Sequence, residues 1–160
     1  MTQAPCPCGS GNSYSQCCER LHDGIPAETA EQLMRSRFSA FALGHQNPPF
    51  YASYLQATHV GASEDEIDSL MQSFNQQTWL SLYVLASARG LASDNEGMVE
   101  FTAFFRSPDG DVQQLHEKSR FVRDAGHWRY LDGQFLPAYK VPRNAACWCG
   151  SGKKHKHCHG

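Results

Sequence analysis

The sequence predicts an α+β fold in which three helices precede about four antiparallel strands, and not a fold of alternating strands and helices. Apolar residues recur at helical spacing up to Phe74. From Leu80 onward they alternate with more polar residues, as half-buried strands do. Short turn sequences such as Pro108-Asp109-Gly110 separate the alternating segments.

The first helix is expected over residues 29–44. Thr29 and Gln32 match a capping box at its start, and Gly44 is placed to end it. One helical face would carry the apolar side chains of Leu33, Met34, Phe38, Phe41 and Ala42.

Two shorter helices are expected next. Pro49 can begin one that runs through Tyr54 and Leu55, since proline is favoured in a first helical turn. Ser63 and Glu66 match a second capping box. The helix after it would carry apolar residues at i, i+3, i+4 and i+7, namely Ile67, Leu70, Met71 and Phe74.

The alternating pattern predicts four strands, at residues 80–88, 99–105, 112–123 and 127–132. On the third strand, Glu117 and Ser119 fall on the same side as Leu115 and Phe121.

The three tryptophans have different expected roles. Trp79 and Trp128 lie in strand contexts and are expected to fill the core. Trp148 lies between two cysteines, so it should either shield a metal ion or contact the body of the domain.

Charge and hydropathy exclude some classes of protein. The formal net charge of −2 provides no overall attraction to nucleic acid or to a membrane surface. No run of about eighteen apolar residues exists that could span a bilayer, and the polar, cysteine-containing N-terminus does not resemble a secretory signal. We therefore expect a cytoplasmic protein.

Cysteine usage indicates two metal sites. All seven cysteines lie in two short terminal motifs, and an odd number scattered in this way does not suit a disulfide framework. Counting His159 as the eighth ligand gives four ligands per motif, the set expected of closed, structural Zn²⁺ sites. Iron, a redox or copper-handling role, and disulfides are the alternatives. The predicted ligands are Cys6, Cys8, Cys17 and Cys18 at one end, and Cys147, Cys149, Cys158 and His159 at the other.

His155 and His157 lie close to the second motif and could compete with His159 as ligands. The spacing favours His159, because it occupies the position that Cys18 has in the first motif.

Both motifs, Cys6-Pro7-Cys8-Gly9-Ser10-Gly11 with Cys17-Cys18 and its counterpart ending in His159, resemble the SEC-C motif found at the C-terminus of the translocase motor SecA. In SecA this module contacts an export chaperone, so the resemblance implies a protein or ribonucleoprotein partner. The second copy carries Lys153, Lys154 and Lys156, which could contact that partner or, as a weaker expectation, bind nucleic acid directly. The first copy lacks these lysines.

The whole chain resembles the YchJ-like family of uncharacterised bacterial proteins. The resemblance rests on the two motifs, on residues 33–38, on residues 117–121 and on residues 126–133. It implies a cone-shaped domain similar to nuclear transport factor 2 (NTF2), of the cystatin-like type, with helices on a curved antiparallel sheet. We accordingly expect zinc knuckles at residues 1–22 and 143–160, flanking an NTF2-like domain at residues 27–136.

These features favour a zinc-binding adaptor over an enzyme. The alternative is a ligand-binding protein or enzyme that uses a pocket between sheet and helices, because folds of this type often hold a ligand there. Polar candidates for that pocket are Arg35, Arg37, His59, Glu117, Arg120 and Asp132. Glu117 with His59 could form an acid–base pair if the two converge, whereas a purely structural role would pair Glu117 with Arg120 or a helix N-terminus.

Overall fold

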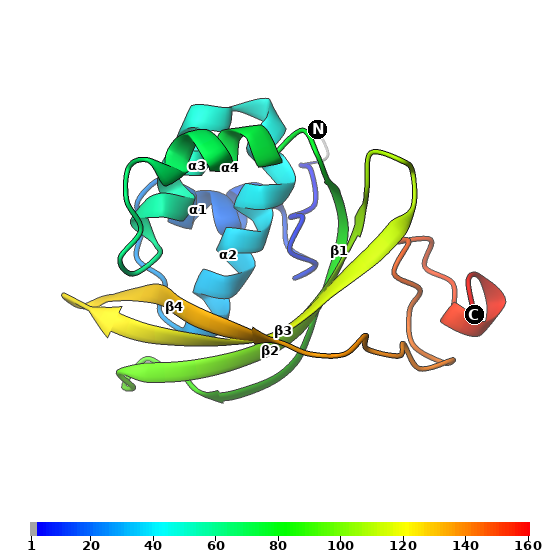
Figure 1. Ribbon diagram of the computed structural model, residues 1–160. Coiled ribbons are helices and arrows are strands. Elements are labelled where there is room, and N and C mark those ends of the chain that lie inside the picture. Colours follow the sequence, from blue (N-terminus) through cyan, green and yellow to red (C-terminus); the bar gives the residue numbers. More distant parts are fainter. Residues whose placement is uncertain (1–2) are drawn as a thin grey trace.

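Four antiparallel strands form one curved sheet, and helices cover its concave face (Figure 1). The computed structural model describes residues 3–160. The strands are neighbours in chain order: β1 (Thr78–Arg89), β2 (Glu96–Arg106), β3 (Val112–Asp124) and β4 (His127–Phe135). The helices are α1 (Cys18–His22), α2 (Ala30–Leu43), α3 (Pro48–Ala57) and α4 (Glu66–Ser73). This arrangement confirms the predicted α+β fold.

Helix α2 is the element on which the two layers are built. Its first turn is capped as predicted, because the Thr29 hydroxyl accepts a hydrogen bond from the Gln32 N–H at 3.1 Å. The Gln32 side chain in turn accepts from the Glu28 N–H at 2.9 Å. The helix then buries Leu33, Met34 and Phe38 against the sheet.

Two of the predicted helix caps do not form as the sequence suggested. Gly44 does not end α2 through a left-handed residue, because its φ of −53° is right-handed and the chain continues into a 3₁₀ turn, η2 (Gly44–Gln46). Its role is close packing, since a Cβ there would lie 2.3 Å from a ring carbon of Phe74. The capping box expected from Ser63 is wrong as well: α4 begins at Glu66 with no side-chain cap, and only the Ser63 carbonyl accepts from the Glu66 N–H.

The register of the sheet selects which side chains face the helices. Phe101 of β2 pairs with Glu117 of β3, which pairs with Phe135 of β4, so these three lie on one side. The pairing of β1 with β2 has two register shifts, between Trp79 and Ser81 and between Val84 and Ala86, and the pairing of β3 with β4 has one. Such bulges bend the strands and contribute to the curvature of the sheet.

Two clusters of buried residues hold the fold together. The larger lies between α2 and the sheet and includes Trp128 together with three cysteines of the N-terminal motif. The smaller joins α3 and α4 to the end of α2 around Ala52, Leu55 and Phe74. No helix within residues 3–160 is both long enough and apolar enough to cross a membrane.

Candidate metal centres

The two terminal motifs adopt the same backbone conformation. In each, the N–H of the first cysteine donates to a carbonyl six residues on, Cys6 to Asn12 and Cys147 to Lys153, both at 2.9 Å. The glycine after each second cysteine is left-handed, with φ of 78° at Gly9 and 80° at Gly150, a region that favours glycine. A 3₁₀ turn precedes the last two ligands in both copies, η1 (Tyr14–Gln16) and η3 (His155–His157).

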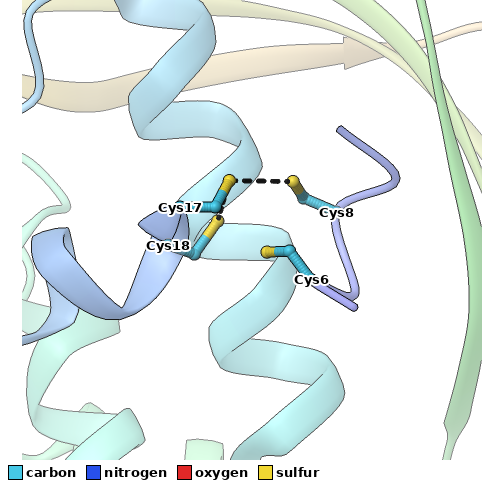
Figure 2. A group of neighbouring side chains, drawn as sticks. All are labelled: Cys6, Cys8, Cys17 and Cys18. Carbon is cyan, nitrogen blue, oxygen red and sulfur yellow. Dashed lines mark hydrogen bonds between the residues drawn. The ribbon is translucent and has the colours of Figure 1, made fainter. Parts of the chain in front are cut away.

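In the N-terminal motif the four thiol groups converge on one point (Figure 2). All four sulfur atoms lie within 4.8 Å of one another. The Sγ atom of Cys17 lies 3.7 Å from that of Cys8 and 3.9 Å from that of Cys18. Around a tetrahedral Zn²⁺ with Zn–S bonds of about 2.3 Å, neighbouring sulfurs stand ~3.8 Å apart. The four cysteines therefore fit a zinc ion in size, ligand type and number.

The C-terminal motif brings together Cys147, Cys149, Cys158 and His159. The Nδ1 atom of His159 lies 3.2 Å from Cys147 Sγ and 3.1 Å from Cys158 Sγ, and the two sulfurs of Cys149 and Cys158 lie 3.5 Å apart. His155 is a poorer ligand, because its Nδ1 lies 3.7 Å from Cys147 Sγ and it is not part of the converging group. The geometry thus favours His159.

The chemistry of the thiols also suits a bound cation. Contact with the Cys6 and Cys8 sulfurs, and then burial, raises the pKa of Cys18 far above its usual range. In the C-terminal motif, the Ser151 hydroxyl and backbone N–H lower the pKa of Cys149 to about 6. A divalent metal replaces the protons of such a cluster and relieves the repulsion between adjacent thiolates. All seven cysteines are free thiols, as metal ligation requires.

The N-terminal motif is built into the core. Cys8 has no exposed surface, and Cys6 and Cys18 are 5% and 2% exposed. Helix α2 holds the loop through Arg35, whose Nη1 donates to the Cys8 carbonyl at 2.8 Å, and through Ser39, whose hydroxyl lies 3.6 Å from Cys6 Sγ. The motif lies between α2 and β1 (Figure 1).

A buried hydrogen-bond chain joins the same motif to the helices. The Tyr14 hydroxyl contacts His22 Nδ1 at 2.7 Å and the Tyr51 hydroxyl at 3.0 Å. His22 Nε2 lies 2.8 Å from the Ser36 carbonyl. A carbonyl only accepts, so Nε2 carries the proton and Nδ1 accepts from Tyr14. Burial lowers the pKa of His22, which therefore stays neutral at pH 7.

The C-terminal motif lies on the opposite, convex side of the sheet (Figure 1). The Trp148 ring stacks on Phe104 of β2, with centroids 5.8 Å apart and planes 14° from parallel, and its other neighbour is His159 at 4.4 Å. The contact with the body of the domain expected of Trp148 is therefore confirmed, and the ring also packs on the candidate ligand His159. The Tyr83 hydroxyl donates to the Ala146 carbonyl at 3.0 Å.

The segment that leads to this motif is also fastened to the sheet. The Gln114 amide makes two hydrogen bonds to the backbone of Tyr139, accepting from its N–H at 2.8 Å and donating to its carbonyl at 2.9 Å. His116 Nδ1 donates to the Pro137 carbonyl at 2.7 Å. These contacts give the C-terminal knuckle a defined position rather than a loose tether.

The polar candidates for a central pocket do not converge as a group. Arg37 and Glu117 line a cavity between α2 and the sheet, but Arg35 braces the N-terminal motif instead. Arg120 is exposed and pairs with Asp132 on the surface, with Nε 2.6 Å from Oδ1, so the expected Glu117–Arg120 pair is wrong.

His59 does not line that cavity. Its ring packs against Tyr130, with centroids 5.0 Å apart, and the same Tyr130 hydroxyl donates to Glu117 at 2.7 Å. His59 and Glu117 thus touch opposite parts of one tyrosine and form no direct pair. Trp79 also differs from expectation, because it is half-buried and lines the cavity. Sequence reasoning missed Tyr130 as the partner of Glu117.

Comparison with known proteins matches each part of the chain. Residues 29–133 match the family model of the YchJ middle NTF2-like domain, which bears out the NTF2-like fold, and residues 4–20 and 143–160 match that of the SEC-C motif. A UPF0225 protein of Vibrio cholerae is 41% identical over 97% of this chain and 99% of its own length. One from Photorhabdus laumondii is also 41% identical, over 97% and 98%.

Two solved structures are similar as well. The solution structure of a SEC-C motif containing protein from Rhodopseudomonas palustris has a TM-score of 0.67 and 32% identity, and covers 82% of this chain and 98% of that one. The crystal structure of a SEC-C motif containing protein from Psychrobacter arcticus has a TM-score of 0.64 and 32% identity, over 99% and 96%.

Proposed function

The chain belongs to the YchJ-like family of UPF0225 proteins, and from this premise we propose that it is a zinc-dependent adaptor. Each knuckle holds one Zn²⁺, and four protein ligands per ion leave no open coordination position for catalysis. The N-terminal ion secures the core. The C-terminal ion orders a basic loop, which carries Lys153, Lys154 and Lys156 and binds an acidic protein or a ribonucleoprotein.

The distribution of charge carries this proposal. All sixteen acidic residues lie before residue 143, together with ten of the fourteen basic ones, so that part of the chain has a formal charge of −6. The last eighteen residues carry four basic side chains and no acidic one. Three thiolates on a zinc ion do not cancel this charge, and a concentrated positive loop on an acidic protein attracts an acidic partner.

The N-terminal knuckle adopts the same backbone conformation without these lysines, which supports a role for them other than shaping the loop. Asn12, Ser13 and Ser15 take the positions of Lys153, Lys154 and Lys156 in the same backbone conformation. Lys153 and Lys154 are exposed and Lys156 is half-buried. A role in recognition accounts for their presence where a structural role does not.

The basic loop is also presented in a fixed orientation. Trp148 and Tyr83 hold it against the convex face of the sheet, and α1, α2, α3 and α4 all lie on the other side (Figure 1). A surface that is ordered before binding loses less conformational entropy when a partner docks.

The test replaces the lysines of the C-terminal knuckle with the residues found at the same positions of the N-terminal knuckle. The triple variant Lys153→Asn, Lys154→Ser, Lys156→Ser keeps every metal ligand and copies the N-terminal sequence at these positions. The matched control, Lys118→Ser with Lys140→Ser, removes lysines from the sheet and the linker. Proteins captured by each chain are compared by mass spectrometry, with and without ribonuclease, beside the zinc content.

We expect the triple variant to keep its zinc and lose its specific partner, while the control keeps both. Ribonuclease separates a protein partner from a ribonucleoprotein. An unchanged set of captured proteins at unchanged zinc content would contradict the proposal.

A further inference from the structure

A cavity of about 330 Å³ lies between α2 and the concave face of the sheet, and the knuckles take no part in it. Its wall is largely aromatic and aliphatic, including Phe38, Trp79, Phe101, Phe105 and Leu115. Pockets that bind small molecules measure roughly 300–1,000 Å³, so this one is large enough for a compact ligand. Gln77 and Phe135 are exposed and mark its opening, and Phe135 is 73% exposed.

The cavity contains a buried carboxyl group that is only partly satisfied. Glu117 is 7% exposed. Its Oε1 atom accepts hydrogen bonds from Ser119 at 3.1 Å and from Tyr130 at 2.7 Å. Within residues 3–160, no group donates to its other oxygen, Oε2. Oε2 is not among the fully buried polar atoms that lack a partner, so it keeps some accessible surface and can accept a hydrogen bond from a ligand in the cavity.

The neighbouring strand makes room for this carboxyl group. Gly133 of β4 lies beside Ser119, and a Cβ atom at position 133 would come within 1.7 Å of Glu117 Oε1. Any other residue there would push the carboxyl group out of its place. The fold thus accommodates Glu117 in the wall of the cavity through a specific backbone feature, in place of the apolar side chain that the core would otherwise favour.

Arg37 determines the charge that a ligand can carry. Its Nη1 donates to the Leu55 carbonyl at 2.8 Å and to the Thr58 hydroxyl at 2.6 Å, and its guanidinium lies 5.0 Å from the centroid of the Tyr130 ring. Burial lowers the pKa of Arg37 to about 10, so it stays charged at pH 7. One cation and one carboxylate already balance each other in the wall. A ligand with a net charge would leave an uncompensated charge inside.

We propose that this cavity binds a neutral, mainly aromatic small molecule with one hydroxyl or N–H group, which donates a hydrogen bond to Glu117 Oε2. Phenols and indoles are the chemical class that fits. Aromatic rings of the wall already make edge-to-face contacts with one another, such as Phe38 with Trp79 at 5.8 Å between centroids. An aromatic ligand can make contacts of the same kind with these rings. This ligand site is separate from the adaptor surface and does not depend on it.

Isothermal titration calorimetry with a matched pair of probes tests the proposal on the full, zinc-loaded chain. 2-Naphthol has the required hydroxyl, and 2-methoxynaphthalene has the same rings without a donor. We expect 2-naphthol to bind with a one-to-one stoichiometry and the ether to bind at least about tenfold more weakly, since a hydrogen bond to a carboxylate is roughly twice as strong as a neutral one.

Two variants locate the site. Glu117→Gln should weaken 2-naphthol binding about tenfold and reduce its advantage over the ether, while Glu96→Gln, at an exposed position, should change neither. Ala103→Leu adds a larger side chain to the cavity wall and should abolish binding of both probes while the thermal midpoint stays the same or rises.

The proposal is overturned if 2-naphthol fails to saturate the protein up to about 1 mM, or if the two probes bind equally well. It is also overturned if the Ala103→Leu variant binds like the wild type. If Glu117→Gln does not fold, the probe pair and Ala103→Leu decide the question without it.

Discussion

A chelator added in excess to the zinc-loaded protein should remove the two metal ions at very different rates. In the C-terminal knuckle, Cys149 and His159 are exposed, so a chelator reaches the ion while the fold stays intact. In the N-terminal knuckle, three of the four cysteines are buried in the main core. The core must open before that ion can leave.

The contacts that hold the N-terminal loop in the core determine the expected ratio between the two rates of zinc release. Opening breaks at least three hydrogen bonds: the one from Arg35 to the Cys8 carbonyl, the one from Tyr14 to His22, and the one that Tyr14 accepts from the Tyr51 hydroxyl. At about 1 kcal/mol each, these amount to ~3 kcal/mol, and 1.4 kcal/mol corresponds to a factor of ten. The second ion should therefore leave at least ~100-fold more slowly than the first, before the burial of the cysteines is counted.

Zinc release is followed with a coloured chelator, and two phases of equal amplitude are expected. The variant Cys147→Ser, Cys149→Ser should lose the fast phase alone. Arg35→Met removes one of the three hydrogen bonds and should speed the slow phase about fivefold without changing the fast one. A single phase for the wild type, or a fast phase that survives in the double variant, would refute the reasoning.

Three further predictions concern packing and pH. Gly44→Ala places a methyl group against Phe74 and should lower the free energy of unfolding in urea by about 1–3 kcal/mol; an unchanged value would show that the ring can move aside. Trp148→Ala removes the stack on Phe104, worth about 0.5–1.5 kcal/mol beyond its buried area, and should speed amide hydrogen exchange in residues 146–158 but not in α2. Burial lowers the pKa of His22 below its usual 6.5, so its contribution to stability is complete above about pH 6.5 and is lost as the pH falls further. Between pH 7.5 and pH 5.5 the free energy of unfolding should therefore fall less in the His22→Gln variant than in the wild type. An equal fall in both proteins would contradict the role given to His22.

Local patterns in the sequence were sufficient for much of the fold. The change from helical to alternating periodicity after Phe74 depends only on neighbouring residues, and it predicted α2, α3, α4 and the four strands in their order, whereas the short helix α1 was not predicted. The eight candidate ligands could be chosen for a similar reason. A metal knuckle is a short loop, so its ligand spacing is almost its entire structure.

Glu117 shows where such reasoning stops. Its place on an apolar strand face was evident, but the expected partner, Arg120, is the neighbour three residues along the same strand and points to the opposite side. The actual partner, Tyr130, comes from β4 through a pairing shifted at Arg120 and Phe121. A register shift of this kind depends on how two strands pack and leaves no local signature.

The sequence by itself determined that the chain carries two copies of one cysteine-rich SEC-C loop on either side of an α+β domain. Only the tertiary structure decided that the copies differ in place, one inside the core and the other on the convex face of the sheet. Tyr14 and Trp148, which are not ligands, make the difference through contacts with Tyr51 and Phe104, partners 37 and 44 residues away. Burial is a property of such long-range packing, and two loops with the same spacing acquire it only from the surfaces against which they come to rest.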